Sequence, residues 1–228
     1  MFRIIESQQF LQKKDVIIGS VIAMIMASVF IYVGGTALLA TFIPALIVAW
    51  LVFVSMYLKS MPLPKGTTFV PLFMMAISWQ FLHFTEEFSN HFSDLFPVLY
   101  GAPAFTHVKF ISINMISYFL FTIATVLVFT KGLRFLFVPV LFFVMGGALG
   151  NAIWHTWWVI WFKGYFPGFY TAQIYWIISF ILISAIVKSN KATVGIMVLL
   201  MLLLVPSLTY LASPDGIIAV KQQIINHW

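Results

Sequence analysis

A histidine and two glutamates stand together at the end of a strongly apolar stretch, in the segment His83-Phe84-Thr85-Glu86-Glu87. On a helix that turns by about 100° per residue, the three ionisable side chains lie within about 60° of the histidine direction and share one face. A charged group at the centre of a bilayer costs roughly 2.5–3.5 kcal/mol, and less near its edge. We therefore interpret the group as a functional site rather than as a cluster that only joins helices.

The spacing of these residues indicates a metal site. His83 and Glu86 are spaced i, i+3, as are paired ligands on the helices of carboxylate-bridged metal proteins. His155 is a candidate third ligand, which leaves an open position for water, and Glu87 would be the general base. Asn151, four residues before His155, is a further catalytic candidate. The candidate ligands are His83, Glu86, Glu87 and His155, and ligation without cysteine fits Zn²⁺, Fe²⁺ or Mn²⁺.

The composition places this site in a membrane. The chain is 62% hydrophobic and 8% charged, whereas soluble domains carry about 25% charged residues. Runs of about 20 apolar residues recur along it, which predicts an all-α, polytopic bundle of transmembrane helices with the lipid bilayer as its surroundings. The net charge is +6, but the basic residues are dispersed at segment ends, which argues against a nucleic-acid partner.

Seven spans are predicted, in one domain covering residues 1–228: 16–33, 36–58, 68–88, 110–130, 133–161, 172–187 and 193–211. Gly34-Gly35 separates the first two and predicts a tight hairpin. Residues 1–15 form a polar arm, and residues 213–228 are expected outside the membrane or along its surface.

Basic residues divide unequally between the two sides of this layout. One side carries nine, namely Arg3, Lys13, Lys14, Lys59, Lys65, Lys131, Arg134, Lys188 and Lys191. The other side carries three: Lys109, Lys163 and Lys221. Cytoplasmic loops are enriched in Lys and Arg, so the N-terminus is predicted to be cytoplasmic.

The topology then brings the polar residues to one depth. His83, Glu86 and Glu87 fall in the outer third of the third span, and Asn151 and His155 fall in the outer third of the fifth. Further polar residues are expected near this level, in span four and the outer loops: Asn114, His91, Asp94, His107, residues 165–171 and Gln173. Four tryptophans at 154, 157, 158 and 161 are interpreted as an interfacial belt.

The motif H-x-x-E-E at 83–87, the later Asn151 and His155, and the segment Tyr165-Phe166-Pro167-Gly168-Phe169-Tyr170-Thr171-Ala172 resemble the HXXEE-motif family of integral membrane proteins. The resemblance covers about residues 70–190. It implies a bacterial inner-membrane protein that uses these residues, and it implies no particular reaction.

Several functions fit the site. The first is a metal-dependent enzyme acting on a lipid or another lipophilic small molecule. The second is a metal-free lipid isomerase with glutamate and histidine as acid and base. The third is a cation- or proton-coupled transporter, which is less favoured because the polar residues cluster at one depth and no inverted repeat is visible. A structural or chaperone-like membrane protein is the fourth.

Overall fold

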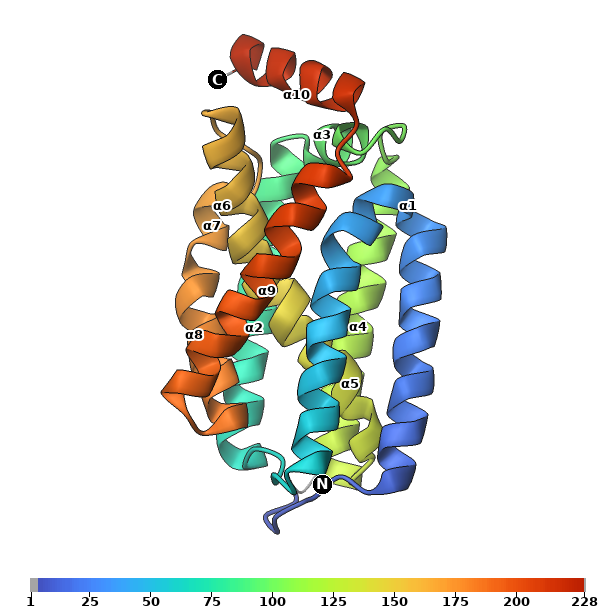
Figure 1. The fold of residues 1–228 in the computed structure, drawn as a ribbon, viewed down its shortest axis with the longest axis vertical. Coiled ribbons are helices and arrows are strands. Elements are labelled where there is room, and N and C mark those ends of the chain that lie inside the picture. Colours follow the sequence, from blue (N-terminus) through green and yellow to red (C-terminus); the bar gives the residue numbers. More distant parts are fainter. Residues whose placement is uncertain (1–3, 228) are drawn as a thin grey trace.

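The computed structural model describes residues 4–227 as a bundle of helices (Figure 1). Within that range, six helices are long and apolar enough to cross a membrane. They are α1 (Lys13–Leu58), α2 (Gly66–Ser89), α4 (His107–Lys131), the composite helix Arg134–Phe162, the helix Phe169–Val187 and α9 (Asn190–Tyr210). The predicted all-α transmembrane bundle is confirmed. Arg3, which entered the count of basic residues, lies outside the described residues.

Helix α1 is a hairpin. Its 46 residues would extend about 69 Å if straight, more than twice the hydrocarbon thickness of about 30 Å. Gly35 breaks it with φ 56° and ψ −140°, a conformation that glycine adopts without steric cost. The indole nitrogen of Trp50 donates to Ser20 Oγ at 2.9 Å, so the arms 13–34 and 36–58 lie side by side (Figure 1). Six helices thus provide the seven rods predicted from the sequence.

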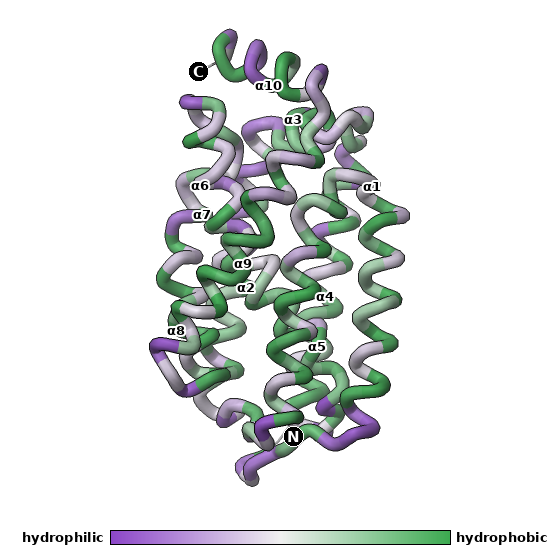
Figure 2. The backbone as a smooth tube through the Cα atoms, viewed as in Figure 1, coloured by the Kyte–Doolittle hydropathy of each residue, from purple (hydrophilic) through white to green (hydrophobic). Residues whose placement is uncertain are grey.

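The connections alternate between the two ends of the bundle. The N-terminal arm lies at one end, where the Ile5 amide donates to the Phe129 carbonyl at 2.8 Å. The α1 hairpin turn, α3 (Phe92–Leu99) and α10 (Pro214–His227) lie at the other (Figure 1). Hydrophilic residues gather at both ends of the bundle, with apolar helix surface between them (Figure 2). The segment expected outside or along the membrane forms α10, which is joined to α3 by the Ser213 amide donating to the Leu99 carbonyl at 2.9 Å.

The composite helix Arg134–Phe162 is the centre of the bundle. In its most apolar window 89% of residues are buried, against 22–61% in the other five helices. It consists of η1 (Arg134–Leu136), α5 (Phe137–Phe142), a π-helical stretch η2 (Phe143–Gly150) and α6 (Asn151–Phe162). The chain then turns back through α7 (Phe169–Ala172) into α8 (Ile174–Val187).

The π-helical stretch sets the direction of Asn151. The backbone N–H of Asn151 donates to the Gly146 carbonyl, five residues back, as a π-helical turn requires. The Gly147 carbonyl accepts instead from the Asn151 side chain at 2.7 Å. The wide turns therefore end at the residue that begins α6, one helical turn before His155.

Candidate metal centre

Three buried side chains meet between α2 and α6. His83 and Glu87 stand one turn apart on α2, and His155 approaches from α6. Glu87 Oε1 lies 3.4 Å from His83 Nε2 and 3.3 Å from His155 Nε2. One ligand atom from each residue lies within 4.8 Å of the other two. The arrangement has the ligand types and spacing of a site for a divalent metal ion.

The two imidazole Nε2 atoms have no hydrogen-bond partner among residues 4–227, although both are buried. Their distances to Glu87 are short, but their N–H directions are not aligned with its oxygen. A buried polar atom left without a partner costs about 1–3 kcal/mol. Two such atoms within 3.4 Å of one carboxylate oxygen are the arrangement that a bound cation would satisfy.

Glu86 faces the other way. Its Oε1 accepts from the Tyr165 hydroxyl at 2.7 Å and from the Tyr170 amide at 3.1 Å. Its Oε2 accepts from the Thr171 amide at 2.8 Å and from the Thr171 hydroxyl. Burial, together with the neighbouring carboxylate, raises the pKa of the Tyr165 hydroxyl and keeps it a donor.

The structure separates the two glutamates, which were both expected among the candidate ligands. Glu87, also expected as the base, lies between the histidines, whereas Glu86, expected beside His83 as a ligand, holds the α6–α7 connection. The direction of each side chain explains the difference. His83 and Glu87, one turn apart, stack on the face of α2 that meets α6. Glu86, the residue before Glu87, points about 100° away from it, toward α7.

Thr171 links Glu86 to the candidate metal-ligand group, which consists of His83, Glu87 and His155. Its hydroxyl donates to Glu86, so it accepts from His83 Nδ1 at 2.8 Å. This bond places the imidazole proton on Nδ1 and leaves Nε2, 3.4 Å from Glu87 Oε1, with a free lone pair. The indole nitrogen of Trp79 donates to the Thr171 carbonyl at 2.9 Å and fixes the same segment. Outer partners of this kind orient metal-binding histidines in known sites.

Gly168 covers the group from the α6–α7 connection. Its φ of 90° is in the region that favours glycine. A Cβ placed there would lie 2.5 Å from His155 Cε1 and 3.0 Å from Glu87 Cγ. The segment 165–172, which the family resemblance singled out, is therefore the cover of the site.

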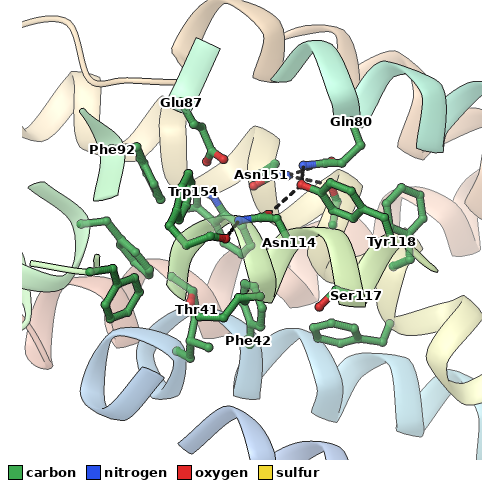
Figure 3. A pocket seen from close by; sticks show the side chains of 18 of the residues that line it. Thr41, Phe42, Gln80, Glu87, Phe92, Asn114, Ser117, Tyr118, Asn151 and Trp154 are labelled. Carbon is green, nitrogen blue, oxygen red and sulfur yellow. Dashed lines mark hydrogen bonds between the residues drawn. The ribbon is translucent and has the colours of Figure 1, made fainter. Parts of the chain in front are cut away.

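A cavity of about 70 Å³ adjoins Glu87 (Figure 3). One wall is a row of hydrogen-bonded side chains. Gln80 Nε2 donates to the Tyr118 hydroxyl at 3.0 Å, which donates to Asn114 Oδ1 at 2.7 Å. Asn151 Nδ2 lies 3.3 Å from Gln80 Oε1, which also accepts from the Tyr175 hydroxyl. The row offers amide and hydroxyl groups to a polar part of a substrate beside the Glu87 carboxylate.

The sequence reasoning placed Asn151 and Asn114 at this level, and the structure brings both into the row. It missed Gln80, Tyr118 and Tyr175. A signal for Gln80 existed, because it precedes His83 by three residues on the same helix face. For the tyrosines there was none, since a lone tyrosine in an apolar helix is common in membrane proteins.

Other expected residues lie elsewhere. His91 and Asp94 form an exposed pair at 3.2 Å at the end of the bundle that holds α3. The His107 ring packs against Phe88, with centroids 5.3 Å apart. The Gln173 side chain donates to the Phe169 carbonyl at 3.0 Å. None of these side chains belongs to the metal-ligand group.

The tryptophan belt is only half present. Trp154 and Trp158 are buried and line the cavity, so their assignment to the belt was wrong. The cause is the central position of α6, which turns this face of the helix toward the bundle. Trp157 and Trp161 are partly exposed.

Comparison of the chain with models of protein families, with curated proteins and with solved structures found no match. The resemblance to the HXXEE-motif family stays a prediction, and the geometry of the site carries the functional argument.

Proposed function

We propose that the protein is a membrane-embedded, metal-dependent enzyme that acts on a lipid or another lipophilic small molecule. The observation that carries the proposal is the convergence of His83 Nε2, His155 Nε2 and Glu87 Oε1 at one buried point beside a cavity. A bound divalent ion supplies Lewis acidity there. Zn²⁺, Fe²⁺ and Mn²⁺ all suit two imidazoles and a carboxylate.

The chain's own residues have separable roles in this proposal. His83, His155 and Glu87 hold the ion, and Thr171 with Glu86 orients His83. The row of Gln80, Tyr118, Asn114 and Asn151 orients the polar part of the substrate. The segment 165–172 excludes water from above.

The surroundings favour a lipophilic substrate. Besides Glu87 and the polar row, the cavity is lined mainly by aromatic and aliphatic side chains, including Phe92, Phe96, Phe105 and Phe110. The site lies inside a bundle whose helices have membrane length. Together with the excess of basic residues at the opposite end, this favours a site in the non-cytoplasmic leaflet, and the family resemblance favours a bacterial inner membrane.

Metal content of the detergent-purified protein tests the proposal. We expect near-stoichiometric zinc, iron or manganese by elemental mass spectrometry in the wild type, and its loss in His83→Ala. His107→Ala is the matched control, because this histidine packs on Phe88 outside the group. A wild type that stays empty after metal is added back would overturn the metal proposal.

A second candidate rests on the same three residues without a metal. Glu87 lies within 3.4 Å of both imidazoles, which is the arrangement of a histidine–carboxylate acid/base pair. Such a site would suit a lipid isomerisation. An empty wild type that still depends on His155 for activity would favour this candidate.

A further inference from the structure

A second hollow lies beside the first, between the arm 13–34 of α1 and α4. Its volume is about 610 Å³, far larger than that of the cavity at Glu87. Its lining is apolar, and side chains such as Ile25, Ile116 and Leu120 are more than half exposed. In a bundle of membrane helices, exposed apolar side chains face lipid, so this hollow is a groove open to the bilayer.

The groove and the cavity share a wall. Four residues line both of them: Leu38, Ile113, Ser117 and Phe121. Ser117 lies next to Tyr118, which belongs to the polar row of the cavity (Figure 3). A chain lying in the groove would therefore pass beside the cavity that leads to Glu87.

The groove has one charged lining residue among those described, Lys109 at the outer end of α4. Its ammonium lies 4.2 Å from the centroid of the Phe105 ring, and Phe105 also lines the cavity. From Lys109 to Leu127 the α4 axis rises about 27 Å, nearly the thickness of the hydrocarbon core. The groove thus joins a cation near the level of the site to an apolar channel long enough to hold a lipid chain.

We propose that this groove binds the hydrocarbon chain of the substrate, and that the substrate is a single long chain with an anionic end. The inference rests on the proposed function and specifies its substrate class. The chain lies along α4 with its anionic end near Lys109, and the part of the chain that passes Ser117 lies against the wall shared with the cavity. Ordinary bilayer lipid would cover any apolar face, but the recess, the cation and the shared wall distinguish this one.

The test uses a 16-carbon fatty acid with a diazirine near its methyl end, added to the protein in nanodiscs and activated by light. Peptide mapping should find the label on residues 22–33 and 116–127. Leu120→Trp fills the groove, and Leu202→Trp is its matched control, since Leu202 is an exposed leucine of α9 outside the groove. Leu120→Trp should reduce groove labelling about tenfold, as expected when two methylene groups lose their apolar contact. Equal labelling in the two variants would overturn the proposal.

The anionic end is tested with the same chain ending in an alcohol. The carboxylate should label the groove more strongly than the alcohol, and Lys109→Gln should remove the difference, whereas Lys221→Gln on α10 should retain it. A preference that survives Lys109→Gln would overturn the assignment of the anionic end to Lys109.

Metal content separates this inference from the function on which it rests. If the Leu120→Trp protein keeps its metal and is labelled as strongly as the control, the proposed metal site stands and the proposed chain-binding groove is wrong. If the wild type contains no metal but is still labelled specifically in the groove, the proposed metal site is wrong and the proposed chain-binding groove stands.

Discussion

Two buried carboxylates, Asp15 and Glu87, lie at opposite ends of the bundle in different surroundings. Asp15 is 3% exposed and Glu87 is 5% exposed. The Asp15 carboxylate lies 3.1 Å from Arg134 Nε and accepts from the Gln12 amide at 2.8 Å. Glu87 has no such permanent cation, and its near neighbours are two imidazole nitrogens.

The difference is between a buried carboxylate that is paired within the fold and one whose neighbours are left without partners. At the end of the bundle that holds the N-terminal arm, Asp15 is paired with a permanent cation, and Arg134 also donates to the Phe10 carbonyl at 3.0 Å, which holds that arm. At the opposite end the local bonds of Glu86 and Thr171 leave buried polar atoms unpaired. They occupy Nδ1 of His83 and leave Nε2 of His83, like Nε2 of His155, without a hydrogen-bond partner beside Glu87.

The largest expected effect is the loss of metal when Glu87 is neutralised. Glu87→Gln should remove stoichiometric metal, because it takes away the only anionic ligand of the group. Asp15→Asn should keep the metal but lower the free energy of unfolding by about 3 kcal/mol, since it leaves Arg134 without its partner. Elemental analysis and thermal unfolding in detergent measure the two effects. If Asp15→Asn emptied the site, or Glu87→Gln kept it filled, the contrast between the two carboxylates would be wrong.

A substitution in the segment 165–172, which covers the site, should weaken metal binding almost as strongly. Gly168→Ala forces a Cβ against His155 and strains a backbone at φ 90°, so metal binding should weaken severely, with about 1–3 kcal/mol of strain. Gly195→Ala is the control, because a Cβ there meets nothing within 4 Å in helix α9, and it should stabilise the protein by up to about 1 kcal/mol. Metal titration of the two purified variants decides the outcome, and equal affinities would show that the segment does not close on the ligands.

The sequence was sufficient for the helices and for bringing the candidate residues to one level of the bundle. Apolar length and the breaks at Gly34-Gly35 and residues 61–66 predicted every membrane-length rod, because a bilayer admits few alternatives. Matching depths brought His83, Glu87, His155 and Asn151 together correctly. These are consequences of helix rise and topology alone.

The different directions of the Glu86 and Glu87 side chains could not be predicted. A helical wheel places both on the histidine face, and only the packing of α7 against α2 decides which one turns toward the loop. The burial of Trp154 and Trp158 has a similar origin, since the central position of α6 is a property of the whole bundle.

A smaller effect should follow from the link between the two glutamates. Thr171→Val keeps the shape of the side chain but removes the hydroxyl between Glu86 and His83, so metal affinity should fall about 10–100-fold. Thr85→Val is the matched control, because the Thr85 hydroxyl only bonds back to the Phe81 carbonyl at 2.7 Å on the exposed side of α2. Competition with a chelator measures both affinities. An unchanged affinity in Thr171→Val would mean that His83 is oriented by packing alone.

The smallest effect is expected in the polar row, and it marks where the metal-ligand group ends. Tyr175→Phe removes a hydroxyl that donates to Gln80, at a cost of about 1 kcal/mol, while Asn151 still lies 3.3 Å from the same oxygen. The ring stays in place against His83, with centroids 5.7 Å apart, so metal affinity should not change. Tyr32→Phe, at a side chain that is 91% exposed, sets the baseline for losing a tyrosine hydroxyl. A fall in metal affinity in Tyr175→Phe alone would show that the row and the ligands are one unit, and the row would then have to be counted among the groups that set the charge balance at Glu87.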